Sequence, residues 1–352
     1  EISACLVGSE MCIRDRSFSI SSLCVPLLIK LAIKKRLFAE KGGRHIHSKA
    51  VPKFGGFAIF IGFIFSQAYF ILDELGKNNI TQEYFLLIFC VGLLFILGAV
   101  DDLVEINATL KFLIQNIVAV ILVFQANIQI TSFFGLFGIN ELMPLFSIIF
   151  SIAVIVFFIN AYNLIDGIDG LSSSIGMFVV LCFGSIFIYN GYYTDTILCC
   201  SVFAAMFGFW LYNKPPAKIF LGDSGSLSIG LILAYFAIKI SNIPIDNSGT
   251  ISPVFAMIVL VYPVIDTLRV FTIRILKGIS PFTPDKNHIH HSLLELEFSH
   301  GKATIIILIF SVILTIIAFS LRKYPNFSFF TLVPLVVLAS EIPNYLLRKK
   351  SN

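Results

Sequence analysis

Four polar segments of the sequence hold the residue types that catalysis and ligand binding require. They are AVDDL at residues 99–103, NAYNLIDGIDG at 160–170, FLGDSGS at 220–226 and PDKNHIHH at 284–291. Each lies close to an end of a long apolar run. Carboxylate and amide oxygens suit Mg²⁺, which usually keeps some waters and binds one or two carboxylates plus substrate phosphates. The pattern therefore predicts a site for a phosphate-bearing substrate at the edge of an apolar region.

Asp101 and Asp102 are neighbouring carboxylates at the end of an apolar run. Because like charges repel, one of them can become more basic and serve as a general base while a metal ion holds the other. A solvated pair that only marks a membrane surface is the alternative reading. Lys111 follows on the next apolar run and supplies either a cation within reach of the pair or an interfacial anchor.

The segment 160–170 has polar residues at every third position, namely Asn160, Asn163, Asp166 and Asp169. On a helix each neighbouring pair would share a face, so we expect all four to line one wall of a cavity. Gly167 and Gly170 would allow the backbone to approach a ligand closely. A helix end with glycine stop signals is the alternative interpretation.

The segment 220–226 leads into the apolar run at residues 225–241. Asp223 or Ser224 can cap a helix there. The helix N-terminus also offers free N–H groups to a phosphate. Phe220 can stack on a base, or it can simply face lipid or the protein core.

Three histidines, His288, His290 and His291, lie in a long polar loop. The carboxylates elsewhere favour a hard ion over zinc, so contacts to phosphate or sugar are the favoured interpretation. Arg274 and Lys286 would then act as cations, Arg274 with the fork geometry that suits phosphate. A solvated basic loop at a membrane surface is the alternative.

The composition identifies a polytopic membrane protein. The 352 residues are 57% hydrophobic and 13% charged, with a mean hydropathy of +0.91. Soluble domains carry about 25% charged residues. The net charge of +4 is too small to indicate a nucleic-acid partner. The seven cysteines include no CxxC pair and are expected to behave as small apolar residues rather than as disulfides or metal ligands.

The predicted fold is all-α with eleven transmembrane helices, since lipid offers no partners to unpaired backbone groups. The expected helices cover the following ranges: 17–33, 54–72, 84–100, 112–126, 145–162, 172–190, 194–213, 225–241, 251–271, 302–320 and 327–347. Residues 1–16 fit neither a span nor a signal peptide and are expected to be foreign to the native protein. Residues 17–352 are expected to form one integral-membrane domain.

Basic residues predict the orientation. Seven lysines and arginines lie between residues 34 and 53, and such density is typical of a cytoplasmic loop. With eleven spans, the N-terminus then lies outside and the C-terminus in the cytoplasm. All four polar segments fall on the cytoplasmic face, although only basic residues entered the assignment. We therefore expect the polar segments to meet in one site on that face.

In their order and spacing, the motifs of this chain resemble those of the polyprenyl-phosphate N-acetylhexosamine-1-phosphate transferases, glycosyltransferase family 4. The resemblance covers residues 17–350. It rests on the following motifs: RHIHSKAVPKFGG (44–56), GAVDD (98–102), KFLIQ (111–115), NAYNLIDGIDGL (160–171), NKPPAKIFLGDSGS (213–226) and SPFTPDKNHIHHSLL (280–294). The HIHH form and the PxxGG element look like the undecaprenyl-phosphate GlcNAc-1-phosphate transferase branch. The peptidoglycan branch has three successive histidines instead.

The resemblance implies a reaction and its partners. UDP-N-acetylhexosamine, most often UDP-GlcNAc in this branch, reacts with undecaprenyl phosphate to give the undecaprenyl-diphospho-sugar and UMP. The implied cofactor is Mg²⁺, with Mn²⁺ as an alternative. The implied location is the bacterial inner membrane, as the first membrane step of a cell-envelope glycan. The sugar, the downstream glycan and the oligomeric state, including a homodimer, stay open.

The resemblance also implies roles for individual residues. Asp101 or Asp102 would deprotonate the lipid phosphate, and Asp223 would bind the metal with Asn163 as a second ligand. The substrate-binding residues would be Lys111, Asp166, Asp169, Asn213, Phe220, Arg274, His288, His290 and His291. An ion-coupled transporter is the alternative function, because carboxylates inside membranes often mark ion pathways. Transporters place them near the midplane of inverted repeats, however, and the sequence has no internal repeat.

Overall fold

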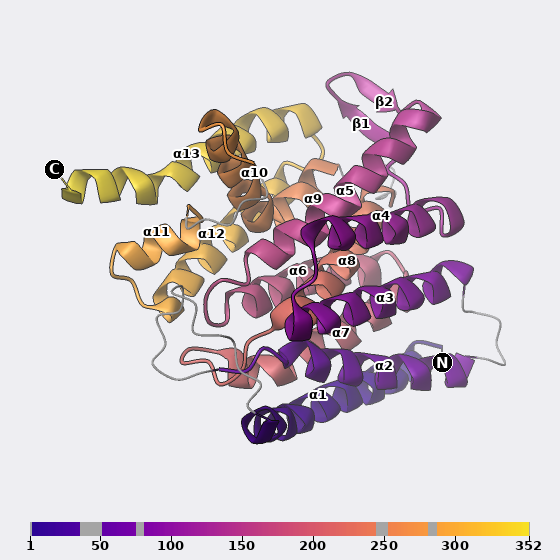
Figure 1. Cartoon of the computed structure of the whole chain (residues 1–352). Coiled ribbons are helices and arrows are strands. Elements are labelled where there is room, and N and C mark those ends of the chain that lie inside the picture. Colours follow the sequence, from indigo (N-terminus) through magenta and orange to yellow (C-terminus); the bar gives the residue numbers. More distant parts are fainter. Residues whose placement is uncertain (1, 36–50, 75–80, 244–252, 281–286, 352) are drawn as a thin grey trace.

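The computed structural model describes residues 2–35, 51–74, 81–243, 253–280 and 287–351, with side chains from Ile13 to Lys350. Thirteen helices and one hairpin form within these ranges. They are α1 (Ile2–Lys35), α2 (Gly55–Glu74), α3 (Gln82–Val104), α4 (Ala108–Gln125), β1 (Ser132–Leu136), β2 (Ile139–Glu141), α5 (Pro144–Leu164), α6 (Leu171–Tyr189), α7 (Tyr193–Asn213), α8 (Gly222–Ser241), α9 (Pro253–Val259), α10 (Val261–Leu276), α11 (Ile289–Glu295), α12 (His300–Ser320) and α13 (Pro325–Ser351). Figure 1 shows them as a bundle in which α2, α3 and α4 run side by side.

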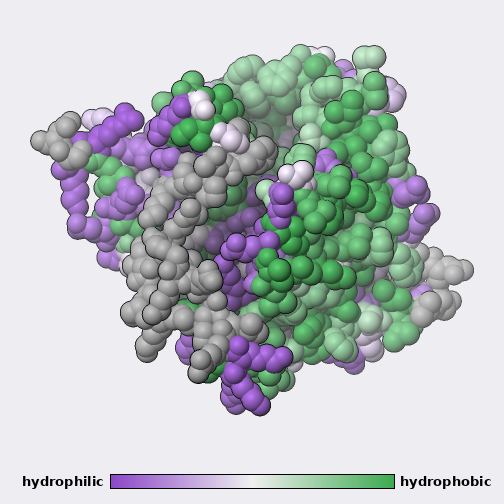
Figure 2. Space-filling view, viewed as in Figure 1, coloured by the Kyte–Doolittle hydropathy of each residue, from purple (hydrophilic) through white to green (hydrophobic). Residues whose placement is uncertain are grey.

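The bundle has the dimensions of a multi-pass membrane protein. Among the described residues, ten helices are long and apolar enough to cross a bilayer, and the bent pair α9–α10 counts as an eleventh. Figure 2 shows a broad hydrophobic surface over α2, α3 and α4. Ten of the eleven expected spans therefore correspond to single observed helices. Which face of the membrane each end of the bundle meets stays a prediction. The foreign origin of residues 1–16 also stays a prediction; residues 2–16 of this segment lie within α1.

The ninth expected span is a broken one. Helices α9 and α10 meet at Leu260 with a bend of 84°. Pro263 lies in the first turn of α10, where its missing N–H costs nothing but where it could not continue a helix from α9. One continuous helix over 251–271 was therefore wrong. The break sends α10 along the outside of α5, which it contacts.

The segment between α4 and α5 contains a small antiparallel hairpin that the all-α prediction missed. Strands β1 and β2 pair at the end of the bundle far from most of the polar segments. Asn326, at the start of α13, accepts a hydrogen bond from the Phe137 amide at 2.8 Å and donates to the Gly135 carbonyl at 2.9 Å. The hairpin is therefore held by a helix distant in sequence.

Helix α8 lies at the centre of the bundle. Within its apolar stretch 94% of the residues are buried, and the helix contacts α2, α3, α5, α6 and α9. Small residues permit this close packing. A β-carbon on Gly230, for example, would lie 2.9 Å from the Cα atom of Ile159 on α5. Helix α8 therefore places its first residues where several other helices begin or end.

Polar contacts hold both ends of α8. At its last turn, Lys239 pairs with Glu83 at 2.6 Å and with Asp195 at 3.0 Å, and so joins the starts of α3 and α7. At its first turn, the backbone of Phe220 bonds to Pro52 and Gly55, each at 2.9 Å. Gly55 begins α2, so the PxxGG element holds the polar segment 220–226 against the start of that helix.

Candidate functional site

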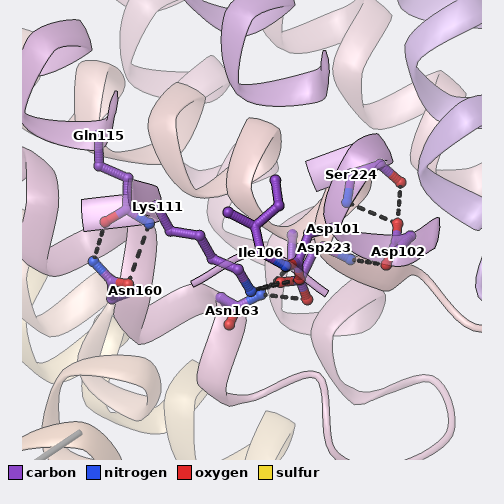
Figure 3. Close-up of polar contacts among 10 residues, drawn as sticks. Asp101, Asp102, Ile106, Lys111, Gln115, Asn160, Asn163, Asp223 and Ser224 are labelled. Atoms are coloured by element: carbon purple, nitrogen blue, oxygen red, sulfur yellow. Dashed lines mark hydrogen bonds and ion pairs between the residues drawn. The ribbon is translucent and has the colours of Figure 1, made fainter. Parts of the chain in front are cut away.

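Asp102 anchors the first turn of α8. Its Oδ1 accepts a hydrogen bond from the Asp223 amide at 2.8 Å, and its Oδ2 accepts from the Ser224 amide at 3.0 Å and hydroxyl at 2.8 Å (Figure 3). A carboxylate at a helix N-terminus satisfies its free N–H groups and interacts favourably with its dipole. The expectation that these N–H groups are available to phosphate was therefore wrong, as was capping by Asp223 or Ser224 themselves.

Asp101 belongs to an ionic centre that Lys111 bridges. The Lys111 ammonium lies 2.5 Å from Asp101 and 3.0 Å from Asp223. The Ile106 amide donates to the other Asp101 oxygen at 2.6 Å. The three side chains are between 11% and 27% exposed, so the centre can meet a ligand from solution. Two carboxylates and one ammonium leave a net negative charge that suits a cation.

Asn163 joins this centre from the last turn of α5. Its amide nitrogen donates to Asp223 at 3.1 Å and to the Ser226 hydroxyl at 2.7 Å. The Asp101 and Asp223 carboxylates offer oxygen atoms, which are the ligands that Mg²⁺ prefers, whereas Asn163 turns its amide nitrogen to Asp223. Among the described residues, no three His, Cys, Asp or Glu side chains are arranged to hold a metal ion. The set therefore fits Mg²⁺ shared with phosphate oxygens, rather than a complete protein cage.

The polar residues at every third position of segment 160–170 share a helix only as far as the end of α5. The helix stops at Leu164, and residues 165–170 form turns before α6 begins. Gly170 has a φ of +74°, a conformation that glycine adopts without strain. Asp166 and Asp169 therefore do not continue the helical face of Asn160 and Asn163, and the prediction that all four line one wall was wrong.

Asp166 lies beside the ionic centre. Its Oδ1 accepts a hydrogen bond from the Ser172 hydroxyl at 2.6 Å. Burial raises the pKa of Asp166 to about 6, against the stabilising effect of Ser172 and of the Gly222 amide on its carboxylate. The contact to Gly222 connects the turn 165–170 to the start of α8. This carboxylate can change charge near neutral pH.

Asp169 and Asn213 are buried and hold loops in place. The Asp169 carboxylate accepts a hydrogen bond from the Ala217 amide at 3.0 Å and lies 3.3 Å from the His300 imidazole. Asn213 donates to the Ile219 carbonyl at 2.9 Å and accepts from the Ser173 hydroxyl. Both residues therefore shape the segment 214–221 that leads to Phe220.

The histidine segment packs behind the turn 165–170. His288 binds Asp266 at 2.6 Å, and the Nδ1 atom of His290 lies 2.9 Å from the Tyr262 hydroxyl. Burial lowers the pKa of His290 to about 3, so its ring is neutral at physiological pH. A β-carbon on Gly167 would lie 2.3 Å from the Nε2 atom of His290. These two rings are thus buried protein contacts, whereas His291 is half-buried.

The structure brings most of the predicted residues together at one end of the bundle. The contacts lead from Asp102 through Asp223 to Lys111, and from Gly222 through the turn 165–170 to His290. Arg274 is buried in the last turn of α10. Lys286 and the basic residues 44–50 lie outside the described residues.

Sequence reasoning missed the residues that hold the predicted ones. Ser226 binds Asn163, and Tyr262 and Asp266 hold the histidines. Ser224, which was expected only as a helix cap, binds Asp102. Asp266 carried a usable signal, because a carboxylate inside a long apolar run is costly unless it has a partner.

An apolar cavity of about 370 Å³ adjoins the centre between α4, α5 and α10. It is lined by Phe112, Asn116, Ile149, Ile152, Ala153, Val156, Phe157, Asn160, Thr267 and Phe271. Phe112 is next to Lys111 in sequence, and Asn160 lies one turn from Asn163. The cavity and the ionic centre are therefore lined by neighbouring residues of the same two helices, α4 and α5.

Comparison with known proteins places the chain in a family. Residues 84–241 match glycosyl transferase family 4. A probable undecaprenyl-phosphate N-acetylglucosaminyl 1-phosphate transferase of Bacillus subtilis is 32% identical over 87% of this chain and 84% of its own length. The undecaprenyl-phosphate alpha-N-acetylglucosaminyl 1-phosphate transferases of Yersinia pestis and Escherichia coli K12 are 26% and 27% identical over 91% and 88% of this chain, and over 86% and 83% of their own lengths. The chain therefore belongs to glycosyl transferase family 4 and is a membrane phospho-sugar transferase.

Proposed function

We propose that the chain transfers N-acetylhexosamine-1-phosphate, specifically GlcNAc-1-phosphate, from a UDP-sugar to undecaprenyl phosphate. The reaction takes place at the cytoplasmic face of the bacterial inner membrane and releases UMP. The observation that carries the proposal is the position of Lys111, which joins two carboxylates and is followed in sequence by Phe112, a residue that lines an apolar cavity. The names of the relatives support the same reaction. Family membership assigns the chain to transferases, so the alternative of an ion-coupled transporter is not retained.

The cavity between α4, α5 and α10 suits the acceptor lipid. Its walls are mainly aliphatic and aromatic, and it opens among helices long enough to span a bilayer. Apolar surface in such a cavity favours a hydrocarbon chain over water. With its first isoprene units there, the acceptor carries its phosphate to Lys111, whose ammonium attracts it.

Asp101 is the better candidate for the base of the neighbouring pair. Both oxygens of Asp102 accept hydrogen bonds from the first turn of α8. If Asp102 turned away to act as a base, the buried amides of Asp223 and Ser224 would lose their acceptor. Asp101 lies against the ammonium that receives the phosphate. In the proposed step, Asp101 takes the proton of the acceptor phosphate as Lys111 turns from the carboxylate to that phosphate.

The acceptor oxygen then attacks the β-phosphorus of the UDP-sugar directly. A bond forms between this oxygen and the β-phosphorus, while the bond from the β-phosphorus to the bridging oxygen breaks and UMP leaves with that oxygen. Such transfers depend mainly on positioning and on electrostatic stabilisation. Asp223 and Asn163 are the residues that would hold Mg²⁺, or Mn²⁺ in its place. The ion would offset the negative charge of the diphosphate.

The turn 165–170 and the segment 213–221 form the donor side in this proposal. The Asp166 carboxylate accepts a hydrogen bond from a hydroxyl group of the UDP-sugar. Phe220 stacks on uracil, and Asp169 and Asn213 fix the loop that presents it. Arg274 and His291 contact the sugar or phosphates. His288 and His290 hold the turn from behind.

Release of UMP tests the proposal. Purified protein in detergent is mixed with undecaprenyl phosphate, Mg²⁺ and one of a panel of UDP-sugars that includes UDP-GlcNAc and UDP-GalNAc. We expect UMP release that requires both the lipid and the metal, and that is fastest with UDP-GlcNAc. Folded protein that releases no UMP with any UDP-sugar would refute the proposed function. A phosphorylated aspartate trapped during turnover would refute direct attack.

A further inference from the structure

The PxxGG element (residues 52–56) contains a lysine that the proposed reaction has not yet used. The Phe220 amide donates to the Pro52 carbonyl, and the Gly55 amide donates to the Phe220 carbonyl, each at 2.9 Å. These two hydrogen bonds lie on either side of Lys53 in the sequence, so they fix the backbone of this residue next to Phe220. The side chain of Lys53 is exposed. A cation is therefore held at a defined place on the surface of the site.

Lys53 lies against the start of α8, beside two carboxylates of the site. A β-carbon on Gly222, the first residue of α8, would lie 2.5 Å from the Lys53 carbonyl oxygen and 2.7 Å from the Oδ2 atom of Asp102. The amide of Gly222 donates to the Asp166 carboxylate, on which the positive charge of Lys53 also acts. Lys53 thus adjoins both the ionic centre and the turn that forms the donor side of the proposed site.

The residues around the first turn of α8 carry an excess of negative charge. The four carboxylates there are those of Asp101, Asp102, Asp166 and Asp223. Lys111 pairs with only two of them. Among the described residues no carboxylate forms a salt bridge with Lys53, and its side chain is open to solvent. Because a nucleotide-sugar brings two further negative charges, its binding requires a cation of this kind on the donor side.

We propose that the Lys53 ammonium binds the α-phosphate of the UDP-sugar, the phosphate that leaves as part of UMP. The backbone of Lys53 lies between Phe220, the proposed platform for uracil, and Gly222 at the ionic centre. The α-phosphate must occupy the same interval, because it joins uridine to the reacting β-phosphorus. As the bridging bond breaks, negative charge grows on UMP and the ammonium offsets it. This inference rests on the proposed function, because it names how the leaving group of that reaction is held.

Binding of UMP and of uridine tests the proposal without turnover. Each is titrated by calorimetry into wild type, Lys53→Gln and Lys302→Gln in detergent with Mg²⁺. The matched control removes the same charge from Lys302, which is exposed in the first turn of α12. We expect the Kd for UMP to rise roughly tenfold in Lys53→Gln alone, since one hydrogen bond between charged groups is lost. The Kd for uridine, which has no phosphate, should stay unchanged, and Lys53→Arg should restore UMP binding.

Kinetics separate this inference from the proposed reaction. In Lys53→Gln the kcat/KM for UDP-GlcNAc should fall roughly tenfold or more, while the KM for undecaprenyl phosphate should change less than about twofold. If wild type releases UMP but both glutamine variants bind UMP equally well, the inference is overturned and the reaction stands. Equal losses of UMP and uridine binding also overturn it, because Lys53 would then act only by shaping the segment around Phe220. Wild type that binds no UMP would overturn both.

Discussion

Replacement of Asp102 separates a structural carboxylate from a catalytic one. Asp102→Ala removes the acceptor of three hydrogen bonds, those from the Asp223 amide and from the Ser224 amide and hydroxyl. Ser224 is fully buried, so water cannot replace the lost acceptor. Each unpaired buried donor costs about 1–3 kcal/mol. We therefore expect Asp102→Ala to lose on the order of 3–5 kcal/mol of stability, which lowers the melting temperature by roughly 5–10 °C.

The comparison variant is Asp101→Asn. Asparagine keeps an oxygen for the Ile106 amide, and Lys111 keeps Asp223 as a partner. Because the ion pair is partly exposed, its loss should cost about 1 kcal/mol or less. Loss of the base, however, should reduce UMP release by about 100-fold or more. Both variants are melted in detergent and assayed at equal concentrations of folded protein. An Asp102→Ala protein as stable as wild type, or an Asp101→Asn protein that is fully active, would refute the reasoning.

Four further predictions rest on particular contacts. Because the pKa of Asp166 is raised to about 6, its carboxylate loses its charge as the pH falls through that value, so the KM for UDP-GlcNAc should rise below about pH 6 in wild type but not in Asp166→Asn. Because the pKa of Asp166 is raised on folding, this carboxyl group stabilises the folded state at low pH, and this contribution to the free energy of unfolding should disappear as the pH rises through about 6. In Asp166→Asn, the free energy of unfolding should depend less on pH over this range. An equally strong pH dependence in the variant contradicts the assignment. Gly167→Ala would place a β-carbon 2.3 Å from His290 and should destabilise the protein by about 1–3 kcal/mol, with a smaller penalty in a His290→Ala background; equal penalties in a double-mutant cycle would exclude this contact. Asn326→Ala loses both hydrogen bonds to the hairpin and should lower stability by about 1–2 kcal/mol without changing UMP release per folded molecule, so altered turnover would argue against a purely structural hairpin.

The helices and the convergence of the polar segments could be predicted because they depend on simple physical requirements. A bilayer demands about 20 apolar residues per span. Basic residues then assign alternate loops to one side, so segments such as 99–103 and 160–170 can be placed at one end of the bundle without a structure. Lys111 was expected within reach of Asp101, and it contacts both that residue and Asp223.

The roles within the site could not be predicted, because they depend on contacts between distant helices. Asp101 and Asp102 are indistinguishable in sequence, yet only Asp102 reaches the amides of α8. The spacing of Asp166 and Asp169 fits a helix, but α5 ends at Leu164 and the turn gives each a separate partner. The hairpin β1–β2 was missed because it is short and is held by α13.

The stoichiometry of one reaction tests the central claim most directly. Wild-type protein and Asp223→Asn are reconstituted into vesicles with undecaprenyl phosphate and supplied with doubly labelled UDP-GlcNAc and Mg²⁺. Wild type should form UMP and lipid-linked GlcNAc-diphosphate in equal amounts. Folded Asp223→Asn, which lacks one of the two carboxylates that Lys111 joins, should form neither. UMP without the lipid product, or undiminished turnover by the variant, would contradict a single site in which the nucleotide-sugar and the lipid react.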